Sequence, residues 1–244
     1  MSPEEFSNNF DTLIDSYKRF KDFDPQEMLD SIEFNEYEKS VFLTKAQEQI
    51  TESLYTGQNH FGNSFEETEL LRRYMASLVR EASLVPISSI SGNPIGMGSH
   101  SKFFTLPSSL WFITYESVEL ESGKCDSMKN LEVIPVTQDE YHRLKKNPFR
   151  GISDRRALRL DLADGIIEIV CKYEVSKYYI RYVERLNPII VEDLPDGISI
   201  EGKSTVTPCM LHESLHQSIL DLAVELALRS KGIGVSQTSK AKEK

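Results

Sequence analysis

The stretch from residue 35 to residue 56 constrains the fold more than any other, because it has the pattern of one long helix. Asn35, followed three residues later by Glu38, is typical of a capping box at a helix start, and Gly57 suits the helix end. The apolar residues recur every four positions and form one stripe: Phe42, Ala46, Ile50 and Leu54, widened by Tyr37 and Val41. A helix with such a stripe needs partners that cover it.

Three further segments have helical periodicity and are predicted to cover this stripe. They are residues 3–19, 65–84 and 208–231. Ser2-Pro3 with Glu5 predicts the start of the first helix, and Thr207-Pro208 predicts the start of the last. These segments lie toward both ends of the chain, so we expect a helical core that is interrupted by an insertion.

Between residues 110 and 186 the hydrophobic period changes to two, which predicts strands. The predicted strands are residues 110–120, 131–136, 157–162, 166–173 and 178–186, with a short helix from Thr137 to about Lys146. Asp164-Gly165 is typical of a tight hairpin turn. We therefore interpret the last three strands as an antiparallel meander.

The predicted fold class is α+β, with a helical bundle built from the N-terminal helices and the C-terminal helix and an inserted antiparallel β subdomain. Residues 1–85 and 206–231 would form the helical core, and residues 110–205 would form the β subdomain. Residues 86–109 contain Pro86, Pro94 and Pro107 among glycines and serines, which predicts a long extended loop or arm. Residues 232–244 are polar and are expected to be a flexible tail.

Composition narrows the possible functions. The net charge of −10 argues against a general nucleic-acid binder, which usually carries a basic surface. The cysteines, Cys125, Cys171 and Cys209, form no C-x-x-C pair, so we expect reduced thiols and no structural metal. We expect no signal peptide and no membrane contact, because the sequence has neither the required basic and apolar start nor an apolar run of about 18 residues.

One motif has the spacing of a catalytic metal site. His212-Glu213-x-x-His216 matches H-E-x-x-H, which on a helix would place two zinc ligands on one face beside a general base. A zinc-dependent hydrolase is therefore an alternative, although Ile219 and Leu222 stand where a metzincin has glycine and histidine. No complete nucleophile–base pair or phosphate loop is present, so we predict no enzymatic activity, no catalytic residues, no metal and no cofactor.

Two short basic pairs, Lys145-Lys146 and Arg155-Arg156, are interpreted as solvated surface. Contact with DNA or with an acidic partner is the alternative interpretation for these pairs.

Two segments carry a resemblance to a known family. The sequence NEYEKSVFLTKAQEQI, within residues 33–55, and CMLHESLHQSILDLAVELAL, residues 209–228, are similar to segments of head–tail connector proteins of crAss-like bacteriophages. YYIRYVERLNPIIVEDL, which begins at Tyr178, also resembles these proteins and related portal adaptors of short-tailed phages. The resemblance implies a structural role rather than a reaction.

The resemblance further implies a virion protein that forms a dodecameric ring below the portal, around the DNA exit channel. Its partners would be copies of itself, the portal protein and other connector and tail proteins. Double-stranded DNA would pass during genome ejection without sequence-specific binding. The protein would be made in the host cytoplasm and reside at the head–tail junction. A tail-tube or tail-completion protein of the same phage type remains the nearest alternative.

The irregular segments are the expected contacts with other subunits or with the portal. Phe103, Phe104 and Leu106 would be apolar anchors on the loop at 86–109. Lys240, Lys242 and Lys244 would bring positive charge on the tail to an acidic partner.

Overall fold

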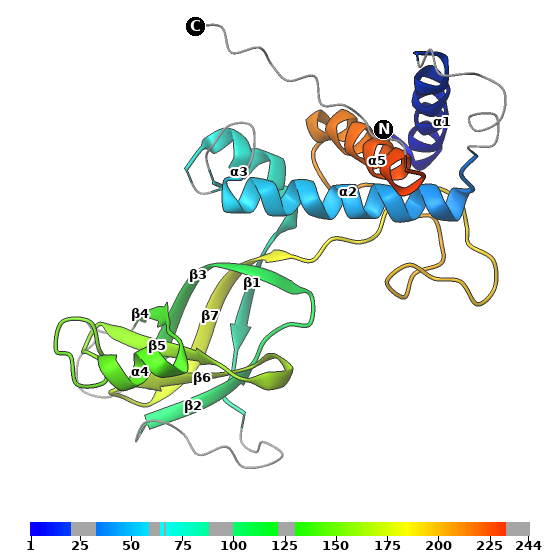
Figure 1. Cartoon of the computed structure of the whole chain (residues 1–244). Coiled ribbons are helices and arrows are strands. Elements are labelled where there is room, and N and C mark those ends of the chain that lie inside the picture. The colour runs from blue at the N-terminus through cyan, green and yellow to red at the C-terminus, as the bar shows by residue number, and fades with distance from the viewer. Residues whose placement is uncertain (21–32, 59–63, 66, 88–99, 122–129, 233–244) are drawn as a thin grey trace, which may run out of the picture. The chain divides into compact units, whose positions relative to one another are not determined.

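A computed structural model describes residues 1–20, 33–58, 64–65, 67–87, 100–121 and 130–232 (Figure 1). The chain forms two compact units. The helical unit comprises residues 1–78 and 186–244, and the sheet unit comprises residues 79–185. Helices and a seven-stranded sheet are both present, which confirms the predicted α+β class.

The helical unit is built around α2, Glu36–Thr56. The capping box between Asn35 and Glu38 is present, and Gly57 ends the helix with a φ of 80°. Helix α1, Pro3–Phe20, begins with a reciprocal pair of hydrogen bonds between Ser2 and Glu5. Helix α5, His216–Ser230, follows a 3-10 turn, Glu213–Leu215, and packs against both α2 and α1. The helix starts at residues 3 and 36 were therefore predicted correctly.

Two predicted helices differ from the structure. The helix expected at 65–84 is only α3, Glu69–Met75, followed by a 3-10 turn, Ala76–Leu78. The chain then becomes strand β1, Val79–Leu84, because its backbone pairs with β7, Val175–Glu184. The last helix starts at His216 rather than at Pro208, because Thr207 pairs with Ile190 through two backbone hydrogen bonds.

The sheet unit has the strand order β1-β7-β3-β4-β5-β6-β2. The strands not yet given are β2, His100–Thr105; β3, Leu110–Leu120; β4, Asn130–Pro135; β5, Arg156–Asp161; and β6, Ile166–Cys171. The short helix α4, Gln138–Leu144, has the predicted capping box between Thr137 and Glu140. Asp164 and Gly165 have φ values of 60° and 70°, as the turn between β5 and β6 requires.

Three features of the sheet were predicted wrongly. The pair β4–β5 is parallel, with α4 in the connection, so the sheet is not purely antiparallel. The predicted meander of the last three strands is also wrong. Strand β6 pairs with β5 and β2, whereas β7 lies between β1 and β3. The segment 86–109 is not one irregular loop, because residues 100–105 form β2. Residues 88–99 lie outside the described part of the chain.

The sheet curls around its own core. Phe104 of β2 and Tyr178 of β7 are both fully buried, and their ring centroids lie 5.4 Å apart although the strands do not pair. Beyond β1, the Ile87 N–H donates to the Phe103 carbonyl of β2 over 2.8 Å, which brings the two ends of the sheet together. A second, smaller cluster forms where Tyr141 of α4 packs on Leu158, Leu160 and Val170.

In the described part of the chain, no helix has the length and apolar character that a membrane span needs.

The burial of α5 gives a prediction about stability. Leu228 is 2% exposed, whereas Leu222 is only half-buried. Leu228→Ala should therefore cost about 2–5 kcal/mol of unfolding free energy, and Leu222→Ala should cost clearly less. Urea denaturation followed by circular dichroism measures both values, and equal losses would contradict the orientation of α5 described here.

Candidate subunit architecture and surfaces

Helix α2 binds a long extended segment through its side chains. Ser40 Oγ accepts the Val191 N–H over 3.1 Å, and Thr44 Oγ1 accepts the Ile189 N–H over the same distance. Gln47 Nε2 donates to the Asn187 carbonyl over 2.9 Å. These side chains are spaced four and three positions apart along the helix, and they contact alternate residues of the extended segment. The backbone groups of residues 187–191 thus find hydrogen-bond partners on α2, in place of the partners that a neighbouring strand would normally supply.

The buried face of α2 is therefore not the apolar stripe that the sequence predicts. Ala46 and Leu54 are buried as expected, but Phe42 and Ile50 are only half-buried. Ser40, Thr44, Gln47 and Thr51 are buried instead, together with Leu43. Polar side chains at helical spacing are the signal that could have identified this face, because burial is tolerated when each polar group finds a partner.

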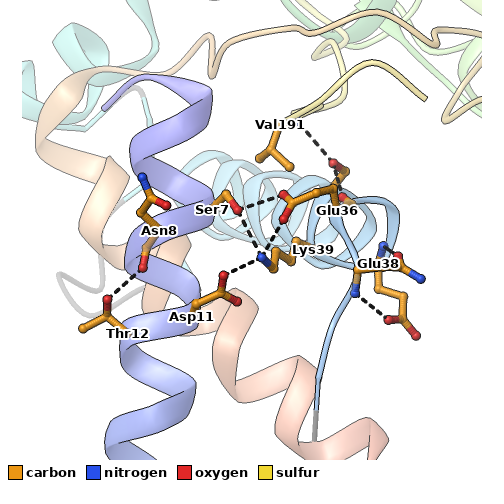
Figure 2. A network of polar contacts seen from close by, with 10 residues as sticks. Ser7, Asn8, Asp11, Thr12, Glu36, Glu38, Lys39 and Val191 are labelled. Atoms are coloured by element: carbon orange, nitrogen blue, oxygen red, sulfur yellow. Dashed lines mark hydrogen bonds and ion pairs between the residues drawn. The ribbon is translucent and has the colours of Figure 1, made fainter. Parts of the chain in front are cut away.

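Lys39 joins α2 to α1 through a buried charge (Figure 2). Its ammonium donates to Asp11 Oδ2 over 2.6 Å, to Glu36 Oε1 over 2.7 Å and to Ser7 Oγ over 3.1 Å. Ser7 in turn donates to the other oxygen of Glu36 over 2.8 Å. Burial alone would lower the pKa of Lys39, but the hydrogen bonds to the two carboxylates outweigh it and raise the pKa. The lysine is thus held charged, with an acceptor for each of its donors.

The H-E-x-x-H segment does not form the predicted helical face. His212 precedes the 3-10 turn, where its Nδ1 accepts the Ser214 N–H, and its ring packs on Tyr74. His216 begins α5 and is buried, with Nε2 3.1 Å from the Leu211 carbonyl and Nδ1 2.6 Å from the Met1 amine. Burial lowers the pKa of His216, and the Met1 charge adds to this shift. Both ring nitrogens of His216 are thus engaged within the protein.

No group of three or more His, Cys, Asp or Glu side chains is arranged to hold a metal ion among the residues that the structure describes. Burial raises the pKa of the Cys209 thiol to about 11 and also raises that of Cys171, so both thiols stay protonated near neutral pH.

The sheet unit contains a buried polar network of its own. Tyr178 donates to Glu116 Oε2 over 2.6 Å, and Arg159 Nη1 donates to Glu116 Oε1. Burial raises the pKa of Glu116, and the hydrogen bond from Tyr178 and the charge of Arg159 partly offset this effect. Burial and the nearby carboxylate raise the pKa of Tyr178 far above its ordinary value. The network connects β3, β5 and β7 to one another in the interior of the curled sheet.

The predicted contact residues occupy different environments. Phe104 is fully buried in the core of its own sheet unit, so its ring is not exposed to a partner. Phe103 and Leu106 are half-buried, and the Leu106 N–H donates to the Gly165 carbonyl over 2.8 Å. Their role at an interface stays a prediction. Lys240, Lys242 and Lys244 lie outside the described residues.

The sequence interpretation missed one surface residue. Phe149 is 87% exposed, more than any other large hydrophobic side chain in the described part of the chain. Its position between the basic pairs at 145–146 and 155–156 is the signal that could have identified it.

The described residues form two compact units, each with its own buried polar network, and they show no metal-binding cluster. Comparison with known proteins indicates a structural role. The model of the family described as phage tail ring protein 3/4 matches residues 1–239. Ring protein 3 of Bacteroides phage crAss001 is 42% identical over 234 residues, which cover 95% of this chain and 96% of the relative. Ring protein 4/5 of the same phage is 28% identical over 236 residues, which cover 93% and 92%.

The chain therefore belongs to the phage tail ring protein 3/4 family. It is a structural ring protein of a crAss-like phage particle and not an enzyme, as the sequence resemblance implied. The zinc-dependent hydrolase alternative is accordingly wrong.

The contact between α2 and the extended segment can be tested directly. Thr44→Val keeps the side-chain shape but leaves the buried Ile189 N–H without its acceptor, which should cost about 1–3 kcal/mol of unfolding free energy. Thr56→Val is the matched control, because Thr56 is exposed and its hydroxyl donates to the Glu52 carbonyl of the same helix. Urea denaturation of both variants checks this expectation, and similar losses would contradict it.

Proposed function

We propose that the protein forms a closed ring of the head–tail connector, below the portal and around the DNA exit channel. The observation that carries this proposal is the match of the ring-protein family to residues 1–239, together with the two ring proteins of one phage that resemble almost the whole chain. Copies of the chain would contact one another in a dodecameric ring. The portal and other connector and tail proteins would be the neighbouring partners.

The charge of the chain suits a passage for DNA. With a net charge of −10, the protein would repel phosphate wherever its acidic surface faces the channel. DNA would then pass during genome ejection without sequence-specific binding. The tail lysines, Lys240, Lys242 and Lys244, would dock on an acidic surface of the portal or of a neighbouring ring.

A tail-tube or tail-completion protein is the alternative within the same phage type. The two differ in how copies stack. A connector protein forms a single closed ring and assembly ends there, whereas a tube protein stacks ring on ring into a tube without a fixed length.

Assembly of the purified protein tests the proposal. We expect discrete rings in negative-stain electron microscopy and mass photometry, and we expect these rings to co-sediment with purified portal. Deleting residues 232–244 should leave the circular dichroism spectrum unchanged and weaken the co-sedimentation, because the tail lysines are lost. Tubes of unlimited length would favour the tail-tube alternative, and a protein that stays monomeric at all concentrations would contradict the ring.

A further inference from the structure

The connection from α4 to β5 forms a basic surface on an acidic protein. Residues 142–156, here called the basic tip, contain six lysines and arginines and one aspartate. The exposed basic residues are Arg143, Lys145, Lys146, Arg150 and Arg155. The single aspartate, Asp154, already accepts hydrogen bonds from Lys172 and Tyr173. Basic side chains therefore outnumber acidic ones within the tip, although the exposed Asp139 and Glu140 of α4 lie directly before it.

The basic tip has a fixed backbone that holds Phe149 in solvent. Asn147 Oδ1 accepts the N–H groups of Phe149 and Arg150 over 2.9 and 3.2 Å. Arg156 Nη1 donates to the Phe149 carbonyl over 2.9 Å. Gly151 is buried, and a Cβ there would lie 2.3 Å from the Leu144 carbonyl oxygen, so no larger residue fits. An aromatic side chain on a rigid turn loses little backbone freedom on binding, which favours a role as an anchor.

The helical unit carries a surface of opposite charge. Residues 192–206, here called the acidic loop, contain four acidic residues and one lysine, and they form part of the yellow-to-orange segment that loops away from α2 in Figure 1. Glu192, Asp196 and Glu201 are exposed, whereas Lys203 donates to Asn187 Oδ1. Ile198 and Val206 are 40% and 45% exposed, so the loop also offers apolar area.

The acidic loop is also held in a defined shape. The Leu194 N–H donates to the Ser204 carbonyl over 2.7 Å, and the Val206 N–H donates to Asp193 Oδ1 over 2.7 Å. At its base, Ile190 and Thr207 exchange two backbone hydrogen bonds of 3.1 Å. Both surfaces are therefore preorganised, and each combines charge with exposed apolar atoms.

We propose that the basic tip of one copy docks on the acidic loop of the next copy, with Phe149 against Ile198 and Val206. This inference rests on the ring function proposed above and names the contact that would close the ring. Two different, complementary surfaces on one chain give a head-to-tail contact, which is the type that generates rings. Charge complementarity selects the partner, and the aromatic anchor supplies apolar burial.

DNA is the other macromolecule that a basic surface could bind. A protein partner is favoured because the tip exposes a phenylalanine among its cations, whereas phosphate contacts use charged and polar groups. The acidic loop also supplies a partner of matching charge on the same chain.

Charge reversal in two separate variants tests the contact. In the tip-reversed variant four exposed basic residues become glutamate, which changes the charge of residues 142–156 from +5 to −3: Lys145, Lys146, Arg150 and Arg155. In the loop-reversed variant three exposed acidic residues become lysine, which changes the charge of residues 192–206 from −3 to +3: Glu192, Asp196 and Glu201. Because all seven side chains are exposed, both variants should fold as the wild type does. Alone, each variant brings like charges together in every contact and should need about tenfold or more protein to form rings, as measured by mass photometry.

An equimolar mixture of the two variants should form rings again. Each tip-reversed copy then meets loop-reversed copies on both sides, and every contact regains opposite charges in a ring with an even number of copies. This rescue cannot arise from a contact within one chain, because the two reversals lie on different molecules. Rings of the wild type and of the mixture should both weaken as salt is raised.

Phe149→Ser tests the apolar anchor. It should also raise the protein concentration needed for rings by about tenfold or more, without changing the urea midpoint, because the ring is 87% exposed in the single chain. Val85→Ser is the matched control, since Val85 is 68% exposed and lies outside both surfaces in sequence. This control should assemble as the wild type does.

The outcomes separate the two proposals. A wild-type protein that never forms rings contradicts the proposed function. Wild-type rings that persist in the reversed variants, or a mixture that fails to assemble, contradict the tip–loop contact alone. Tip reversal that leaves assembly intact but releases DNA from the rings would assign the tip to nucleic acid and would also overturn the contact.

Discussion

The hydrogen bonds from the α2 side chains to residues 187–191 are the interaction on which the helical unit depends. Pro188, Ile189, Ile190 and Val191 are buried, yet they belong to no regular strand. A buried backbone without partners would cost about 1–3 kcal/mol for each unsatisfied group. Ser40, Thr44 and Gln47 remove that cost and fix the register of the chain as it returns from the sheet unit to the helical unit. The acidic loop begins where this contact ends.

Two other networks of buried polar groups stabilise the protein, one between α1 and α2 and one inside the sheet unit. Lys39 is buried between α1 and α2, but it meets two carboxylates and a hydroxyl, so its charge fixes α1 at a defined position along α2. Glu116, Arg159 and Tyr178 connect three strands inside the sheet unit. Such networks favour one arrangement over many, as a subunit repeated in a ring requires.

The sequence predicted the features that local chemistry determines. Caps and turn residues placed the starts of α1, α2 and α4 and the turn at Asp164-Gly165 correctly. The sequence analysis did not predict the features that depend on contacts between residues far apart in the chain. The helix expected at 65–84 became a strand after residue 78 because β7 offers it a pairing edge. The buried face of α2 was misassigned because hydrophobicity alone does not indicate that Ser40 and Thr44 have backbone partners 145 or more residues away. Phe104 was assigned to an arm because the glycines and prolines around it concealed β2.

The structure describes two units that are each held by buried polar contacts, with a basic tip on one unit and an acidic loop on the other. The measurement that tests this account most directly is a cryo-electron reconstruction of the intact phage particle at side-chain resolution. We expect one closed ring of this chain between the portal and the tail, around the DNA path. Copies of the chain stacked along the tail tube, or absence of the chain from the head–tail junction, would contradict it.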